Sequence, residues 1–169
     1  MSARRGPSVR PAGPADRAWI ESFLARTNST RVARRGELVA PLEHPMLLAL
    51  DGAAPAGLLT YILGKDACEV LTLHAASQRH GAGSALLHAV AGLARDAGCS
   101  RLWLVTTNDN VDALRFYQRR GFHLRALRPG AVDAARRDSK PEIPWIGDHG
   151  IPLRDELELE LDLTEGDEG

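Results

Sequence analysis

The stretch SQRHGAGSALLHAVAGLARDAG, residues 77–98, places the strongest constraint on the fold, because two glycines open a helical pattern directly after an apolar run. That run, ACEVLTLHA at residues 67–75, has the pattern of a buried strand. From Gly83 onward apolar residues recur with the 3.6-residue period of a helix, and Gly98 stands where a helix C-cap is expected. RLWLVTT, residues 101–107, follows as a second strand that is apolar at nearly every position. This order predicts a parallel crossover in a sheet covered on both faces.

Upstream of this unit the pattern predicts mainly strands. A short strand at residues 8–13 precedes a helix at 14–27, in which apolar residues fall at helical spacing. Residues 27–45 show no clear period and are expected to form a loop with a short helix. Residues 46–52 and 56–66 are two strands joined by the turn signal DGAAP, which predicts a hairpin.

Downstream, a second helix and two strands complete the pattern. Residues 108–122 predict the helix, with Asn110 as N-cap and Gly121 at its end, and a strand begins at Phe122. The segment DELELELDL, residues 155–163, alternates leucines with acidic residues, which predicts a strand with one buried and one wet face. The chain is therefore expected to be a mixed α/β domain spanning residues 1–163, with a disordered acidic tail at 164–169.

Composition excludes several classes of protein. The 169 residues suit one domain, and the formal net charge of −1 argues against a dedicated nucleic-acid binder. No apolar run approaches the roughly 20 residues that a membrane span requires, and the N-terminus lacks the apolar segment of a secretory signal. Cys68 and Cys99 have no metal-ligand spacing, and neither do the six histidines, so no metal is expected. An intracellular, cytoplasmic protein is the natural interpretation.

The glycines at the start of the predicted helix favour an anion site. The first N–H groups of a helix have no partner within it, and its dipole places partial positive charge there. A phosphate satisfies both, provided that no Cβ prevents its approach, and Gly81 and Gly83 with the small Ala82 meet that condition. Arg79 and His80 add donors beside the loop. A plain structural turn explains two glycines equally well, and the P-loop and dinucleotide fingerprints are both absent.

Two motifs read together resemble the GNAT superfamily of N-acetyltransferases. The cofactor signature Gln/Arg-x-x-Gly-x-Gly/Ala is matched by Gln78, Gly81 and Gly83. The second signature is matched by Asn110, Ala113, Phe116, Tyr117, Gly121 and Phe122. The resemblance covers residues 68–124. It implies a central, mostly antiparallel sheet of six to seven strands with flanking helices and a central parallel crossover.

The same resemblance implies acetyl-CoA, or a related acyl-CoA, as co-substrate. Its pyrophosphate would lie on residues 78–84 and its pantetheine arm along the backbone of residues 71–74. Arg119 and Arg120 would reach the phosphates, or would form a solvated basic helix end. The cofactor-binding residues implied are Leu71, Leu73, His74, Gln78, Arg79, His80, Gly81, Ala82, Gly83, Ser84, Asn110, Ala113, Phe116 and Tyr117.

Acyl transfer to an amine needs a proton acceptor for the amine and a donor for the departing thiolate. The tyrosine of the second motif, Tyr117, commonly acts as general acid in this family; the alternative is a core tyrosine. Glu69 is a carboxylate in an otherwise apolar strand and is the leading candidate base; the alternative is a salt bridge to a neighbouring strand. His74, at the end of that strand, is the second candidate base.

The acceptor is not identified by these patterns. Residues 132–156 would lie beside the acceptor site, where their carboxylates favour a basic acceptor, whereas Arg31, Arg34 and Arg35 favour an acidic one. The loop residues expected near a cationic or zwitterionic acceptor are Asp148, His149, Arg154, Asp155 and Glu156. The leading function is an N-acetyltransferase acting on a primary amine. A non-catalytic acyl-CoA-binding module and an unrelated nucleotide-binding domain are the alternatives, and the resemblance suggests a homodimer through the C-terminal strands.

Overall fold

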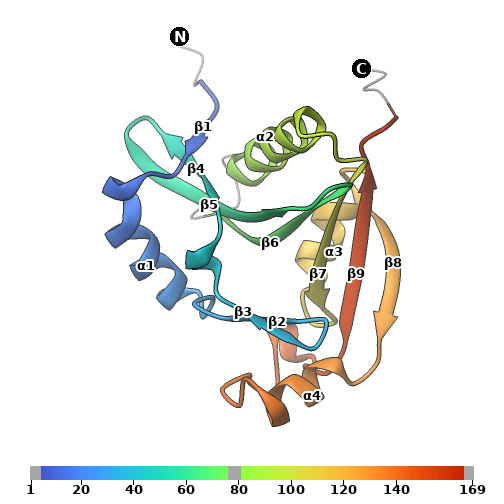
Figure 1. Cartoon of the computed structure of the whole chain (residues 1–169). Coiled ribbons are helices and arrows are strands. Elements are labelled where there is room, and N and C mark those ends of the chain that lie inside the picture. The colour runs from blue at the N-terminus through green and yellow to red at the C-terminus, as the bar shows by residue number, and fades with distance from the viewer. Residues whose placement is uncertain (1–4, 76–80, 166–169) are drawn as a thin grey trace.

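The computed structural model describes residues 5–75 and 81–165. These residues contain a seven-stranded sheet in the order β1-β4-β5-β6-β7-β9-β8, a separate hairpin and four α-helices (Figure 1). The elements are β1 (Ser8–Pro11), α1 (Arg17–Arg26), β2 (Val32–Arg34), β3 (Glu37–Val39), β4 (Met46–Asp51), β5 (Ala54–Leu63), β6 (Ala67–Ala75), α2 (Ala82–Asp96), β7 (Arg101–Thr107), α3 (Val111–Gln118), β8 (His123–Arg128), α4 (Ala131–Asp138) and β9 (Glu156–Asp162), with 3-10 turns at Pro14–Asp16, Pro41–Glu43 and Asp148–Gly150. Within the large sheet β6 and β7 are parallel and the other neighbours are antiparallel. The predicted fold class, with its central parallel crossover, is confirmed.

The helices divide between the two faces of the sheet because successive side chains of a strand point to opposite faces. On β4, Leu47 and Ala49 belong to the large core beneath α2 and α3, whereas Met46 and Leu48 pack against α1. The large core consists of residues that are almost fully buried, among them Leu59, Cys68, Leu86, Val90, Leu102, Tyr117 and Leu159. Sheet and helices therefore form three layers, with α2 and α3 on one side and α1 on the other (Figure 1).

The central strands β6 and β7 pair over only three positions. The ladder runs from Ala67 opposite Arg101 to Glu69 opposite Trp103. Beyond Glu69, β6 continues to Ala75 along β5, and β7 continues along β9. The two strands diverge toward their carboxyl ends, the edge at which α/β folds collect ligands. The backbone of residues 70–75 thus has no strand partner on the β7 side.

The segment expected to be a loop with a short helix contains the β2–β3 hairpin as well as a 3-10 turn. Its two-residue turn, Arg35 and Gly36, has φ of 50° and 75°. Positive φ at both central residues is what a type I′ hairpin turn requires. Gly36 adopts this conformation readily, whereas Arg35 needs tertiary contacts to hold it. The hairpin lies in front of the sheet, below α1 (Figure 1).

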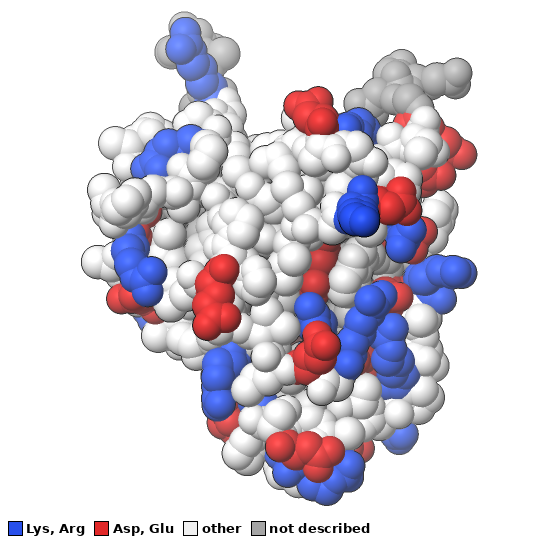
Figure 2. Space-filling model, viewed as in Figure 1, with Lys and Arg blue, Asp and Glu red and all other residues white. Residues whose placement is uncertain are grey.

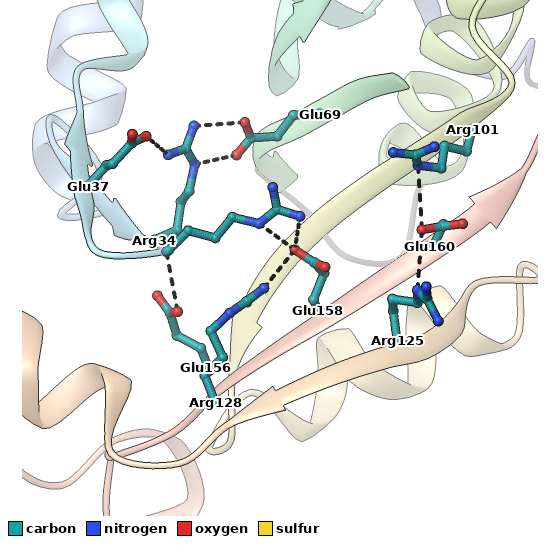
Figure 3. A network of polar contacts seen from close by, with 10 residues as sticks. Arg34, Glu37, Glu69, Arg101, Arg125, Arg128, Glu156, Glu158 and Glu160 are labelled. Carbon is teal, nitrogen blue, oxygen red and sulfur yellow. Dashed lines mark hydrogen bonds and ion pairs between the residues drawn. The ribbon is translucent and has the colours of Figure 1, made fainter. Parts of the chain in front are cut away.

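The acidic face of β9, predicted to be wet, is covered over its first half. Glu156 and Glu158 are buried. Arg35 donates through Nε to Glu158 at 2.6 Å and through its backbone N–H to Glu156 at 3.3 Å, and Arg128 reaches Glu158 at 3.3 Å (Figure 3). The Arg35 guanidinium also lies 3.7 Å from the ring centroid of Trp103. The hairpin supplies Arg35 and β8 supplies Arg128, so the first two glutamates of β9 lie on a covered face, whereas Glu160 is partly exposed and Asp162 is exposed.

A second departure concerns residues 132–156, expected to be a long loop. Its first part continues α4, which is anchored by the buried Val132 and Arg136. Arg136 donates to the carbonyl oxygens of Ile143, Pro144 and Leu153, each within 2.9 Å. On the face seen in Figure 2, basic and acidic side chains are interspersed over the hairpin and the β8–β9 edge. No helix in the described part of the chain is both long and apolar enough to cross a membrane.

Candidate active site

A groove of about 870 Å³ lies where α2 and α3 begin, against the end of β6. Its floor and walls come from three elements that the crossover brings together. The lining residues are Leu73, His74, Ala75, Gly81, Gly83, Ser84, Asn110, Asp112, Ala113, Arg115, Phe116, Tyr117, Arg119 and Arg120. Nine of the predicted cofactor residues are among them. Leu71 lines a neighbouring cavity, Ala82 is buried in the core, and Gln78, Arg79 and His80 lie outside the described residues.

Glycine is favoured at positions 81 and 83 for two different structural reasons. Gly81 is the N-cap of α2 and has φ of 75°, a left-handed conformation that favours glycine. Gly83 lies inside the first turn, where an added Cβ would come within 3.1 Å of Cζ of Phe116. The Arg120 guanidinium stacks over the Phe116 ring, 3.6 Å from its centroid, and donates to Oγ of Ser84 at 2.6 Å. Gly83 therefore permits the close packing of α3 against the start of α2.

A second cavity, of about 390 Å³, opens between the diverging strands β6 and β7. Segments from the other face of the sheet close it: residues 27–34 after α1, Val132 and Ala135 of α4, the turn after α4, and Glu156 at the start of β9. The cavity and the groove share Leu73, His74, Asn110, Ala113 and Tyr117. Two spaces on different faces of the sheet thus meet at one set of side chains.

Tyr117 stands at this junction. Its ring packs edge-on against Phe116 and Phe122, each with centroids 5.3 Å apart, and the residue is 8% exposed. Burial raises the pKa of the phenol, so the hydroxyl stays protonated at neutral pH. The hydroxyl accepts or donates no hydrogen bond within residues 5–75 and 81–165, and it is not among their fully buried unpaired atoms. A core-packed ring thus places at both spaces a hydroxyl that none of the described residues engages.

His74 is the second titratable group that lines both spaces. Its Nε2 lies 2.9 Å from Oγ of Ser29, and its ring meets Phe23 edge-on. Burial lowers the pKa of the imidazole, which favours the neutral ring at pH 7. A neutral imidazole keeps one nitrogen as a proton acceptor. The side chain is therefore suited to receive a proton at the junction.

Glu69, the carboxylate predicted as base, lines neither the groove nor the cavity. Both of its oxygens accept from Arg34, at 2.7 and 2.9 Å (Figure 3). Hydrogen bonding to Glu69 is the main cause that raises the pKa of the Arg34 guanidinium, and Arg34 also donates to Glu37. The geometry is the salt bridge considered as the alternative, except that the partner comes from the hairpin β2–β3 rather than from a neighbouring strand of the sheet.

Other predicted residues serve mainly to hold the site in place. Asn110 is the N-cap of α3, and its Oδ1 accepts from the N–H of Ala113 at 3.2 Å. In the loop before β9, His149 contacts Asp112 at 2.9 Å, and Asp155 accepts from the N–H of Gly130 at 2.8 Å. Asp148, Arg154 and Asp155 line neither space, and of the five loop residues singled out only Glu156 does.

Ser29 and Lys140 are among the polar residues of the second cavity that sequence reasoning missed. Both lie in segments without a readable period, and their positions depend on contacts between distant parts of the chain. Cys68 and Cys99 are buried and free, and burial raises the pKa of the Cys68 thiol to about 12. The His, Cys, Asp and Glu residues of the described ranges form no group that could hold a metal ion.

Comparison with known proteins gives a consistent assignment. Residues 14–122 match the Acetyltransferase (GNAT) family. The uncharacterized protein YdhI of Bacillus subtilis is 48% identical over 102 residues, which cover 60% of this chain and 62% of that relative, so the match spans about three fifths of its length. The uncharacterized N-acetyltransferase Rv2669 of Mycobacterium tuberculosis is 31% identical over 131 residues, 76% of this chain and 82% of the relative.

A solved structure has the same fold. The GNAT family acetyltransferase from Elizabethkingia anophelis, solved with acetyl-CoA bound, aligns with a TM-score of 0.67 and 20% identity, covering 93% of this chain and 98% of that one. At this identity the likeness concerns the fold alone. The family match extends over more than half of the chain and includes both motifs, the crossover and the start of α3. The chain belongs to the GNAT family of acetyltransferases.

Proposed function

We propose that this protein is an N-acetyltransferase that transfers the acetyl group of acetyl-CoA directly to a primary amine. The observation that carries the proposal is the junction at Tyr117 and His74, where a groove and a cavity from opposite faces of the sheet meet. Direct transfer needs such a geometry, because thioester and amine must approach each other while each is held by its own contacts.

The groove suits acetyl-CoA. The free N–H groups at the start of α2 favour the pyrophosphate, and Gly81 keeps a Cβ away from that approach. Beyond Glu69 the backbone of β6 has no partner on the β7 side, which favours amide hydrogen bonds from the pantetheine arm along residues 71–74. Contacts from residues 78–80 stay a prediction.

The chemistry divides between two side chains. As the amine nitrogen attacks the thioester carbon, the neutral imidazole of His74 receives the amine proton and the C–S bond breaks. The hydroxyl of Tyr117 donates to the departing sulfur. Full proton transfer from a phenol of pKa about 10 to the thiolate of a thiol of pKa about 8.5 costs roughly 2 kcal/mol of free energy. Burial raises the pKa of Tyr117 further, so hydrogen-bond donation is its larger contribution. Glu69 is the alternative base, although Arg34 occupies both of its oxygens.

The test is a thiol-release assay with acetyl-CoA and a panel of primary amines. For Tyr117→Phe and His74→Gln we expect kcat to fall about 10²-fold, the low end for loss of a general acid or base. Tyr61→Phe is the matched control, because Tyr61 is equally buried and lines neither space. Glu69→Gln should leave kcat within a few-fold of wild type.

Three outcomes would count against parts of this assignment. If calorimetry detects acetyl-CoA binding but no amine releases thiol, the protein is an acyl-CoA-binding module. If Glu69→Gln abolishes turnover while His74→Gln does not, Glu69 is the base. Failure to bind acetyl-CoA or CoA at all would refute the enzyme assignment.

A further inference from the structure

Besides Tyr117, five residues that can carry charge line the cavity between β6 and β7, and two of them are already paired. Arg31 pairs with Glu142 at 2.8 Å, and Arg34 is held by Glu69 and Glu37. His74 is half-buried and its pKa is lowered, so it is uncharged at neutral pH. The two remaining charged groups are Lys140 and Glu156. Neither forms an ion pair with any residue that the structure describes.

Lys140 is held in place but has donor capacity left. It is 9% exposed, and its Nζ donates to the carbonyl oxygens of Asn28 at 3.2 Å and Arg31 at 2.8 Å. An ammonium group has three N–H donors, so these two contacts leave one. Burial lowers the pKa of this amine, and the nearby carboxylate of Glu142 offsets only part of that shift. A buried cation of this kind gains from an anionic partner.

Glu156 is the complementary case. It is 3% exposed, and within residues 5–75 and 81–165 only the backbone N–H of Arg35 donates to its Oε2, at 3.3 Å (Figure 3). Its Oε1 has no partner among the described residues, yet it is not one of their fully buried unpaired atoms, so it has access to the cavity. Burial raises the pKa of this carboxyl. Its neighbour Glu158, which does not line the cavity, is paired with Arg35 and Arg128.

We propose that Lys140 and Glu156 select an acceptor that is itself an amino acid, a primary amine that also carries a carboxylate. The inference rests on the proposed N-acetyltransferase function and names its substrate class. Glu156 receives the ammonium group of the incoming acceptor, which gives up one proton to solvent before its nitrogen attacks, and Lys140 receives its carboxylate. An uncharged amine would leave Lys140 unpaired, and an acceptor with only positive charge would place a second cation in the same cavity. A zwitterion compensates both buried charges at once, which neither of the other classes does.

The volume and position of the cavity agree with a small acceptor. About 390 Å³ is at the lower end of the range for small-molecule sites, and the space adjoins Tyr117 and His74. The lysine comes from the turn after α4 and the glutamate from the start of β9, so the two charges approach the acceptor from different elements.

The experiment compares matched acceptors in the acetyl-CoA assay. The common L-amino acids, β-alanine and γ-aminobutyrate are each measured beside their carboxamides, which keep the amine and lose the carboxylate charge. We expect at least one amino acid to be preferred over its carboxamide by about tenfold or more in kcat/KM, as one charged hydrogen bond implies.

Variants separate charge recognition from folding. Lys140→Gln should reduce the preference of that amino acid over its carboxamide to nearly one, and Lys140→Arg should restore part of it. Glu156→Gln should raise KM for both acceptors about tenfold, because both carry the amine. Glu158→Gln is the matched control: it removes a buried charge from the same face of β9 without touching the cavity, and it should leave both KM values unchanged.

Three results would overturn the acceptor class. The first is turnover of carboxamides or simple amines as fast as the amino acids. The second is a Lys140→Gln variant that slows both acceptors equally, which is the signature of a purely structural lysine. The third is release of thiol with amines outside the panel while no amino acid reacts, which leaves the acetyltransferase function standing. If acetyl-CoA itself does not bind, the failure lies with the proposed function.

Discussion

Burial shifts the pKa values of three titratable side chains at the groove and the cavity, and each shift favours the neutral form of the group. The pKa of Tyr117 is raised, that of His74 is lowered and that of Glu156 is raised, and burial is the largest cause in every case. A neutral phenol is a donor and a neutral imidazole an acceptor, so two of these shifts produce the protonation states that acyl transfer needs. The third shift, that of Glu156, means that its negative charge is costly in its buried position and is stabilised when a cation binds beside it.

The lowered pKa of His74 predicts the acidic limb of the pH profile. The neutral imidazole is the active form, so kcat should persist as the pH falls to about 6.5, the ordinary histidine value, and decline only below it. His74→Gln, measured with the same acceptor so that the titration of the amine cancels, should lack this limb. The readout is kcat at saturating substrate between pH 5 and about 8. A wild-type limb that survives in the variant would assign it to another group.

At the scale of elements, local patterns predicted the parts of the molecule whose stability is local. α2 and α3 have helical periods, an N-cap or a terminal glycine, and both formed where expected. The hairpin β2–β3 could not be predicted this way, because its arginines are held by Glu69 and Trp103, far away in the sequence. For the same reason the leucine–glutamate alternation of β9 was interpreted as a wet face.

The site shows the same division. Tyr117 and the glycines of α2 are found from motifs within one short segment, whereas Ser29 and Lys140 join the site only through contacts across more than 40 and 100 residues of chain, respectively. Glu69 illustrates the limit: a carboxylate in an apolar strand signals a special partner, but not whether that partner is a substrate or an arginine from a distant hairpin.

The hairpin itself should depend on the pair of Arg34 with Glu69. Both side chains are nearly buried, so Arg34→Met leaves an uncompensated carboxylate and is expected to lower the free energy of unfolding by about 3 kcal/mol. The double variant Arg34→Met, Glu69→Met should recover most of that loss. Arg31→Met breaks an exposed pair and should cost less than about 1 kcal/mol. Urea denaturation measures all three, and equal costs for Arg34→Met and Arg31→Met would show that other contacts hold the hairpin.

For the molecule as a whole, the proposed function gives each substrate its own face of the sheet. The groove lies on the side of α2 and α3, and the cavity is closed from the side of the hairpin and α4. In the proposed reaction both substrates meet at Tyr117, and the buried Cys68 thiol, with its pKa raised to about 12, offers no thiolate for an acetyl-enzyme. This arrangement argues for transfer within a ternary complex.

Initial-rate measurements test that arrangement. Double-reciprocal plots at several acceptor concentrations should intersect rather than run parallel, and mass spectrometry after incubation with acetyl-CoA alone should find no acetylated active-site residue. Parallel lines together with a trapped acetyl-enzyme would instead require one product to leave before the acceptor enters.

Because β6 and β7 diverge, the groove and the cavity draw their walls from partly different stretches of the chain, and these stretches can change separately in evolution. The proposed acetyl-CoA groove is lined by one stretch, residues 73–120, whereas the proposed acceptor cavity is also walled by two other stretches, residues 27–34 and 132–156. These two are bound to each other through Lys140 with Asn28 and through Arg31 with Glu142. Under the proposed function, inherited substitutions in the two outer stretches can thus redirect the enzyme to a new acceptor while the acetyl donor is kept, provided that the paired positions change together.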